Sequence, residues 1–99
     1  MRFVIEYSPE TESHLRALMA RQRATVFDSV DRQLGDQPLT ETRNRKPMRP
    51  NPVTPWELRI GEARVYYDVE VSPIPKVFIR AIGIKKRSRI LIAGEEIQL

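Results

Sequence analysis

The chain has 99 residues, enough for one domain (1–99) with a modest core, and 40% apolar and 30% charged residues are typical of a globular protein in water. It has no cysteine and one histidine, which excludes disulfides, a thiolate nucleophile and a cysteine-based or histidine-based zinc site, so we expect no metal and no cofactor. The net charge of +4 is uneven, because residues 1–42 carry five basic and seven acidic side chains and residues 43–99 carry twelve and six. A basic second half indicates a polyanionic partner such as nucleic acid, or an acidic protein.

No signal-peptide pattern occurs in residues 1–20, and no apolar run approaches the length of a membrane span. We therefore expect a cytoplasmic protein without membrane association.

The first 19 residues predict a strand followed by a short helix. Residues 2–7 alternate in polarity as a strand does, and Ser8-Pro9-Glu10 is typical of a helix start, with serine as N-cap and proline at the first helical position. Leu15, Leu18 and Met19 would form the apolar stripe of this helix. His14 is interpreted as a packed or half-exposed helix residue, because no neighbour in sequence orients it as a base.

A second helical stripe follows and ends at Gly35 as C-cap. It consists of Val26, Phe27, Val30 and Leu34, and it is out of phase with the first stripe across residues 20–23. We predict a helix hairpin, which would cover a small sheet better than a rod, although one bent helix is an alternative.

Residues 36–55 predict an extended surface loop, because they contain five of the eight prolines and few apolar residues. Four cations lie in this segment, and long irregular loops in small proteins are usually functional or disordered. We interpret it as a phosphate-contacting loop, with a solvated linker as the alternative. The four cations are Arg43, Arg45, Lys46 and Arg49.

Residues 56–71 predict a β-hairpin with a two-residue turn at Gly61-Glu62, where glycine supplies the positive φ of a type II′ turn. If Ile60 pairs with Ala63, the alternation on both strands gives one apolar face and one polar face. The apolar face holds Trp56, Leu58, Ile60, Ala63, Val65, Tyr67, Val69 and Val71, and the polar face holds Glu57, Arg59, Arg64, Tyr66, Asp68 and Glu70.

This register places Arg59 directly opposite Arg64. Like charges that face each other across a strand pair are destabilising, so the pair indicates an anion-binding face. The alternative is that both side chains extend into solvent from an exposed sheet surface.

Residues 72–99 predict the rest of the sheet. After a proline-rich turn at 72–75, residues 76–83 form a long strand that is apolar on both faces except at Arg80, which suits a central position. Residues 83–89 are expected to form a basic loop, and residues 89–99 a closing strand or a hairpin about Ala93-Gly94. The expected fold is α+β: an N-terminal strand, a helix hairpin and a largely antiparallel four-stranded sheet, with the helices on one face and the other face open.

Three segments carry a resemblance to a known family. They are Leu58-Arg59-Ile60, Arg64-Val65-Tyr66-Tyr67, and Ala81-Ile82-Gly83 followed by Lys85-Lys86. Together with the order of elements, they resemble the RelE/ParE superfamily of toxins from bacterial type II toxin–antitoxin systems, in particular its RelE-like branch.

This resemblance implies a metal-independent endoribonuclease that cleaves messenger RNA on the ribosome and inhibits translation. The RNA 2′-hydroxyl would attack the adjacent phosphorus and leave a 2′,3′-cyclic phosphate and a 5′-hydroxyl. Cationic side chains can stabilise the charge of the phosphorane-like transition state. Arg64 matches the arginine on the scissile phosphate, and Arg59 matches a basic position on the preceding strand. Lys85 or Lys86 matches a basic residue after the third long strand. The expected catalytic residues are therefore Arg59, Arg64, Lys85 and Lys86, with acid/base work assigned to a lysine of the Lys85-Lys86 pair or to Lys46. The expected RNA-binding residues are Arg43, Arg45, Lys46, Arg49, Tyr66, Arg80 and Arg87. The implied partners are a cognate antitoxin, in a toxin–antitoxin hetero-oligomer, and the ribosome with its message.

Two alternatives stay open, because the segment after residue 86 has neither the tyrosine nor the histidine that several active members carry near the C-terminus. One is a ParE-like toxin that binds DNA gyrase without chemistry of its own. The other is a degenerate toxin that only binds its antitoxin.

Overall fold

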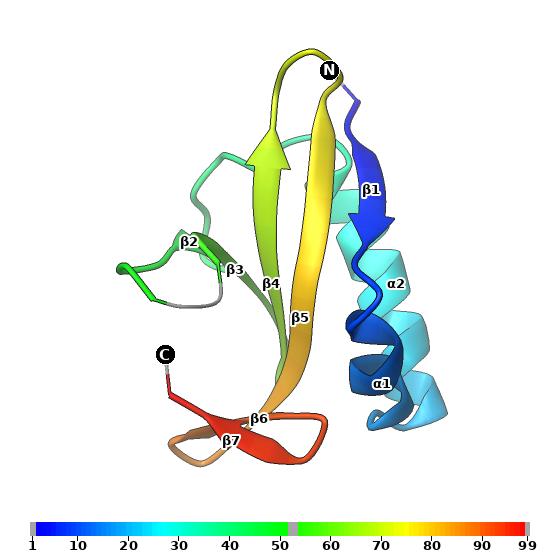
Figure 1. Ribbon diagram of the computed structural model, residues 1–99, viewed down its shortest axis with the longest axis vertical. Helices are drawn as coiled ribbons and strands as arrows, with labels where there is room; N and C mark the ends of the chain where they lie inside the picture. Colours follow the sequence, from blue (N-terminus) through cyan, green and yellow to red (C-terminus); the bar gives the residue numbers. More distant parts are fainter. Residues whose placement is uncertain (1, 52–53, 99) are drawn as a thin grey trace.

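A computed structural model describes residues 2–51 and 54–98 of the chain. Seven strands form one sheet in the order β2-β3-β4-β5-β6-β7, and β1 pairs with β5 off this path (Figure 1). β1 is parallel to β5 and the other pairs are antiparallel. The elements are β1 (Val4–Tyr7), α1 (Thr11–Arg16), α2 (Ala20–Leu34), β2 (Arg45–Pro47), β3 (Trp56–Ile60), β4 (Ala63–Glu70), β5 (Lys76–Lys86), β6 (Arg89–Ile92) and β7 (Glu95–Ile97).

The α+β class and the largely antiparallel sheet are confirmed, but the expectation of four strands after the helices was wrong. β2 was missed because three residues of a proline-rich segment pair with β3, and such a short ladder leaves little alternation to detect. No helix in the described part of the chain is long and apolar enough to cross a membrane.

The β3–β4 hairpin has the predicted register at all five pairs, from Trp56 opposite Tyr67 to Ile60 opposite Ala63. Gly61 has a φ of 57° at the first turn position, as the type II′ turn requires. The hairpin therefore brings Arg59 opposite Arg64, as expected.

The helix hairpin is confirmed, although two details of it were wrong. Arg23 from α2 donates hydrogen bonds to the carbonyl oxygens of Leu15 (3.2 Å) and Leu18 (2.6 Å). One side chain therefore provides hydrogen-bond donors for a carbonyl at the C-terminal end of α1 and for another in the turn after it. Met19 is 71% exposed and lies outside the core. The Ser8 hydroxyl does not cap the helix but donates to the backbone carbonyl of Arg80.

The main core lies between the helices and one face of the sheet, which we call the inner face (Figure 1). The hairpin contributes its apolar face to this core as predicted, except that Val71, beyond the end of β4, is 48% exposed. The fully buried core residues, at 0% exposure, are Val26, Val30, Leu34, Leu58, Val65, Tyr67, Val77, Ile79 and Ile82.

β5 is central, as expected, and a register shift interrupts its pairing with β4. Tyr66 pairs with Ala81 and Tyr67 with Ile79, so Arg80 is an extra residue in β5. This bulge allows Ile79 and Ile82, three positions apart, to be fully buried in the same core. β5 also continues to Lys86, so the predicted basic loop at 83–89 is reduced to a tight turn at Arg87 and Ser88.

The expectation of an open outer face was also wrong. The β6–β7 hairpin turns across the lower end of the sheet in Figure 1, and its Ile92 packs with Tyr66 and Ala81 in a second, smaller core. The close approach depends on Gly83, because a Cβ there would lie 2.9 Å from the Ile92 Cγ1 atom. Tyr66 is consequently fully buried instead of exposed.

Candidate functional site

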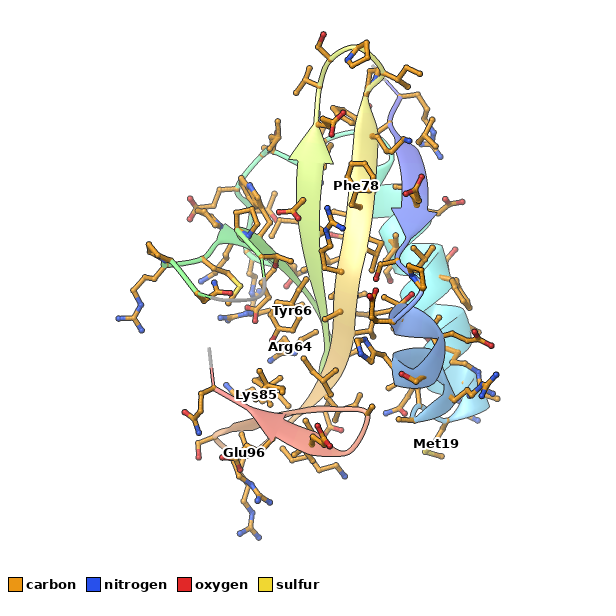
Figure 2. All side chains as sticks on the ribbon, viewed as in Figure 1. Met19, Arg64, Tyr66, Phe78, Lys85 and Glu96 are labelled. Atoms are coloured by element: carbon orange, nitrogen blue, oxygen red, sulfur yellow. The ribbon has the colours of Figure 1, made fainter. Side chains whose placement is uncertain are left out.

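The candidate site lies on the outer face of β2, β3 and β4, beside the segment that follows β2. Strand register places Lys46, Glu57 and Tyr66 in a row across β2, β3 and β4, and the opposed pair Arg59 and Arg64 in the next row. Figure 2 shows Tyr66 and Arg64 in this region, with Lys85 below them toward the hairpin. We call it the basic recess, defined by Lys46, Arg49, Glu57, Arg59, Arg64 and Tyr66. Part of it is a groove of about 630 Å³ lined by Lys46, Pro47, Met48, Arg49, Pro50, Glu57 and Arg59.

Arg64 is anchored so that one edge of its guanidinium is left for a ligand. The side chain is 9% exposed, and its Nη1 donates to the carbonyl oxygens of Gly61 (2.7 Å) and Ala63 (2.9 Å) in the β3–β4 turn. A guanidinium has five N–H donors, and Nη1 supplies two of them. Among residues 2–51 and 54–98, no hydrogen bond engages Nε or Nη2, which form the planar fork that matches two phosphate oxygens.

Arg59 is paired with Glu57, a residue that was predicted on this face but not predicted to have a function. Arg59 Nε donates to Glu57 Oε1 at 2.9 Å, and the two side chains are 44% and 10% exposed. The nearly buried carboxylate therefore lies at the base of the groove while the outer edge of Arg59 faces solvent. Its only signal in the sequence was its spacing of two residues from Arg59 on a strand, which places both on one face.

Tyr66 contributes a buried hydroxyl without a hydrogen bond of ordinary geometry among the described residues. Burial raises its pKa well above the usual range, and the neighbouring Glu57 raises it further, while Arg64 and Arg59 act in the opposite direction. The hydroxyl thus stays protonated at neutral pH. It was expected to contact RNA from an open face, and full burial instead removes both its ring and its hydroxyl from solvent.

The predicted pair Lys85 and Lys86 is divided between the two faces. Both lie at the end of β5 and are exposed. Lys85 is two residues from Gly83, which pairs with Arg64, so it extends the outer-face row of cations. Lys86 lines a small cavity on the other face with His14, and Arg87 occupies the turn beyond it with a φ of 59°.

Among the other predicted RNA-binding residues, two are engaged elsewhere. Arg45 donates from Nη1 to the carbonyl oxygen of Gln33 at 2.8 Å, so it ties β2 to the end of α2 and does not face the recess. Arg80 pairs with Asp68 at 2.8 Å and lies over the ring of Phe78. Figure 2 labels Phe78 higher on the sheet than Tyr66 and Arg64. Lys46 and Arg49 line the groove, and Arg43 is an exposed residue before β2.

The recess concentrates positive charge around one carboxylate. Within the described part of the chain, no group of three or more histidine, cysteine or acidic side chains is arranged to hold a metal ion. The free edges of Arg64 and Arg59 can bind a phosphate and stabilise added negative charge on it.

The comparisons with known proteins identify the fold. No protein-family model matches the sequence, and no curated protein matches it. Among solved structures, the chain is similar to a chain of the RelBE2 toxin–antitoxin complex from Mycobacterium tuberculosis, with a TM-score of 0.70 and 21% identity. The similarity covers 86% of this chain and 100% of that one. The chain therefore has the fold of the RelE toxins, as its resemblance to the RelE/ParE superfamily implied.

Proposed function

We propose that this protein is the toxin of a type II toxin–antitoxin system, and that it cleaves messenger RNA on the ribosome without a metal ion. The main support is the opposed pair Arg59 and Arg64. In the described residues, each guanidinium keeps N–H groups that no hydrogen bond engages. Like charges directly opposite each other on paired strands are destabilising. Glu57 compensates part of this repulsion through Arg59, and an anion bound between the two guanidinium groups would compensate more of it. The RelE fold supports the same proposal, because the similar solved chain belongs to a toxin–antitoxin complex.

In the proposed reaction, the scissile phosphate lies against the two arginines. Arg64 binds it through Nε and Nη2, since its Nη1 is held by the turn carbonyls. Arg59 binds through the amino groups that its ion pair leaves free. The 2′-oxygen attacks the phosphorus, and the charge that develops on the phosphorane oxygens is stabilised by both guanidinium groups. Lys46, Arg49 and Lys85 bind the flanking phosphates.

The proposed partners follow from the same surfaces. The ribosome and its message contact the basic recess, and an antitoxin that bears acidic residues neutralises it in a toxin–antitoxin hetero-oligomer. These partners place the protein in the cytoplasm, with residues 1–99 acting as one toxin domain.

The test is induced expression in a bacterial host, with growth followed and message ends mapped by primer extension. We expect growth arrest and new cuts within reading frames for the wild type, and neither for Arg64→Ala. The matched control is Arg80→Ala, which removes a cation of the same sheet face whose guanidinium is paired with Asp68. Circular dichroism of each purified variant verifies that it is folded.

Two results would replace the proposal. Arrest without RNA cuts would indicate a protein target such as DNA gyrase. A folded wild-type protein that causes no arrest would indicate a degenerate toxin whose role is to bind its antitoxin.

A further inference from the structure

Glu57 is an acidic side chain at the floor of a recess that is otherwise lined by cations. The whole residue is 8% exposed, and it lines the groove with Lys46, Arg49 and Arg59. A buried carboxylate loses its hydration, and a single partner rarely compensates for that loss. In the described ranges, only the Arg59 Nε donates to it with ordinary hydrogen-bond geometry. The Tyr66 hydroxyl also lies beside it. A carboxylate has about four acceptor positions on its two oxygens, so Glu57 keeps acceptor capacity beside the proposed phosphate site.

The strand register places this carboxylate beside the proposed phosphate site. Glu57 and Arg59 are two residues apart on one face of β3, which separates them by about 7 Å along the strand. Glu57 pairs with Tyr66, and Arg59 pairs with Arg64. In RNA, the 2′-hydroxyl is attached next to the phosphate that it attacks. A phosphate held by the two arginines thus brings the 2′-hydroxyl within reach of the Glu57 carboxylate.

The other groups in the recess are poor proton acceptors. Arginine does not lose its proton in proteins. Burial and the Glu57 charge raise the pKa of Tyr66, so its hydroxyl is a donor at neutral pH. Lys46 bears an ammonium group, which must first lose a proton to act as a base. Among the residues that line the groove, Glu57 is the carboxylate.

We propose that Glu57 is the general base of the RNA cleavage, an inference that rests on the proposed function. The Glu57 carboxylate takes the proton of the 2′-hydroxyl as the 2′-oxygen forms its bond to phosphorus. The bond between phosphorus and the 5′-oxygen breaks, and the ammonium of Lys46, opposite Glu57 in the β2–β3 pair, protonates the departing oxygen. Proton exchange with water then restores both side chains. Arg59 holds the carboxylate in place through its Nε.

The experiment measures single-turnover cleavage of a defined message on translating ribosomes by wild type, Glu57→Gln and Glu62→Gln. Glu62 is the matched control, because it is an exposed glutamate in the turn of the same hairpin. Loss of a general base lowers the rate by about 100- to 10,000-fold, and we expect this for Glu57→Gln only. Affinity for a message with a 2′-deoxynucleotide at the cleavage site should be unchanged or tighter, because the substitution removes a negative charge from a cationic recess.

Two further measurements separate the base from other roles. A message with sulfur in place of the 5′-oxygen has a leaving group that needs no proton, so it should restore cleavage by Lys46→Ala but not by Glu57→Gln. Added formate should partly restore Glu57→Ala, because a small carboxylate can occupy the vacated space.

Several outcomes would overturn the assignment. Cleavage by Glu57→Gln at the wild-type rate would remove Glu57 from the reaction. Rescue of Glu57→Gln by the sulfur substrate would make Glu57 the acid instead. Loss of affinity together with rate, without formate rescue of Glu57→Ala, would give it a structural role. A wild-type protein that cleaves nothing would instead refute the proposed function itself.

Discussion

The two adjacent tyrosines of β4 should respond to the loss of a hydroxyl with opposite changes in stability. Tyr66 and Tyr67 are both fully buried. The Tyr66 hydroxyl lacks a hydrogen bond of ordinary geometry within the described residues, whereas the Tyr67 hydroxyl donates to the Pro38 carbonyl oxygen at 2.7 Å. A buried polar group without a partner costs about 1–3 kcal/mol of stability. The nearby Glu57 carboxylate offsets part of that cost for Tyr66.

We therefore expect Tyr66→Phe to raise the free energy of unfolding by about 1 kcal/mol, which corresponds to about 4–8 °C in Tm for a chain of this size. Tyr67→Phe should lower it by about 1–2 kcal/mol, because the buried Pro38 carbonyl loses its donor. Both variants remove the same atom from neighbouring positions, so effects of composition and of the unfolded state cancel between them.

The assay is urea denaturation followed by tryptophan fluorescence. Trp56 stacks on Tyr67 with ring centroids 6.0 Å apart, so its emission reports the main core directly. Equal destabilisation by both substitutions would contradict this prediction, since it would mean that the Tyr66 hydroxyl has a partner in solution as good as that of Tyr67. A gain for Tyr66→Phe would show that burial of the Tyr66 hydroxyl costs more stability than the neighbouring Glu57 carboxylate returns.

Three other predictions concern packing, pH and the direction of two neighbouring side chains. Gly83→Ala should destabilise the protein by about 1–3 kcal/mol in the same urea assay, because its Cβ would lie 2.9 Å from Ile92. An unchanged urea midpoint would show that the β6–β7 hairpin moves freely. Burial lowers the pKa of His14, whose Nδ1 accepts a backbone N–H of β5, so stability should fall as pH drops below the ordinary histidine pKa of about 6.5. His14→Asn should flatten this dependence between pH 7.5 and 5.5, and an identical slope in the variant would assign it to other groups. Arg45→Ala should lower the free energy of unfolding while leaving RNA affinity nearly unchanged, and Lys46→Ala should lower RNA affinity while leaving stability nearly unchanged. Urea denaturation and filter binding measure the two quantities in parallel. If both variants lost the same RNA affinity, Arg45 would belong to the basic recess.

Much of the fold could be predicted because the deciding interactions are local. The β3–β4 register follows from alternation on two strands and one glycine turn, and a shift of one residue would have moved every apolar side chain of a strand to the other face. The two helices could be predicted because the sequence contains two apolar stripes with helical spacing that are out of phase with each other. The same local pattern predicted the opposed arginines, which are the centre of the candidate site.

The sequence alone therefore determined the α+β class, the paired strands and the side chains that share a face with Arg59. Which of these side chains are available to a ligand depends on packing between segments that are distant in the sequence. The bulge at Arg80 and the return of β6–β7 over Gly83 bury Tyr66, because contacts between distant segments are invisible to local periodicity. The extension of β5 likewise sends Lys85 and Lys86 to opposite faces. A strand sets only the alternation of its side chains, whereas packing against remote elements determines which face is covered.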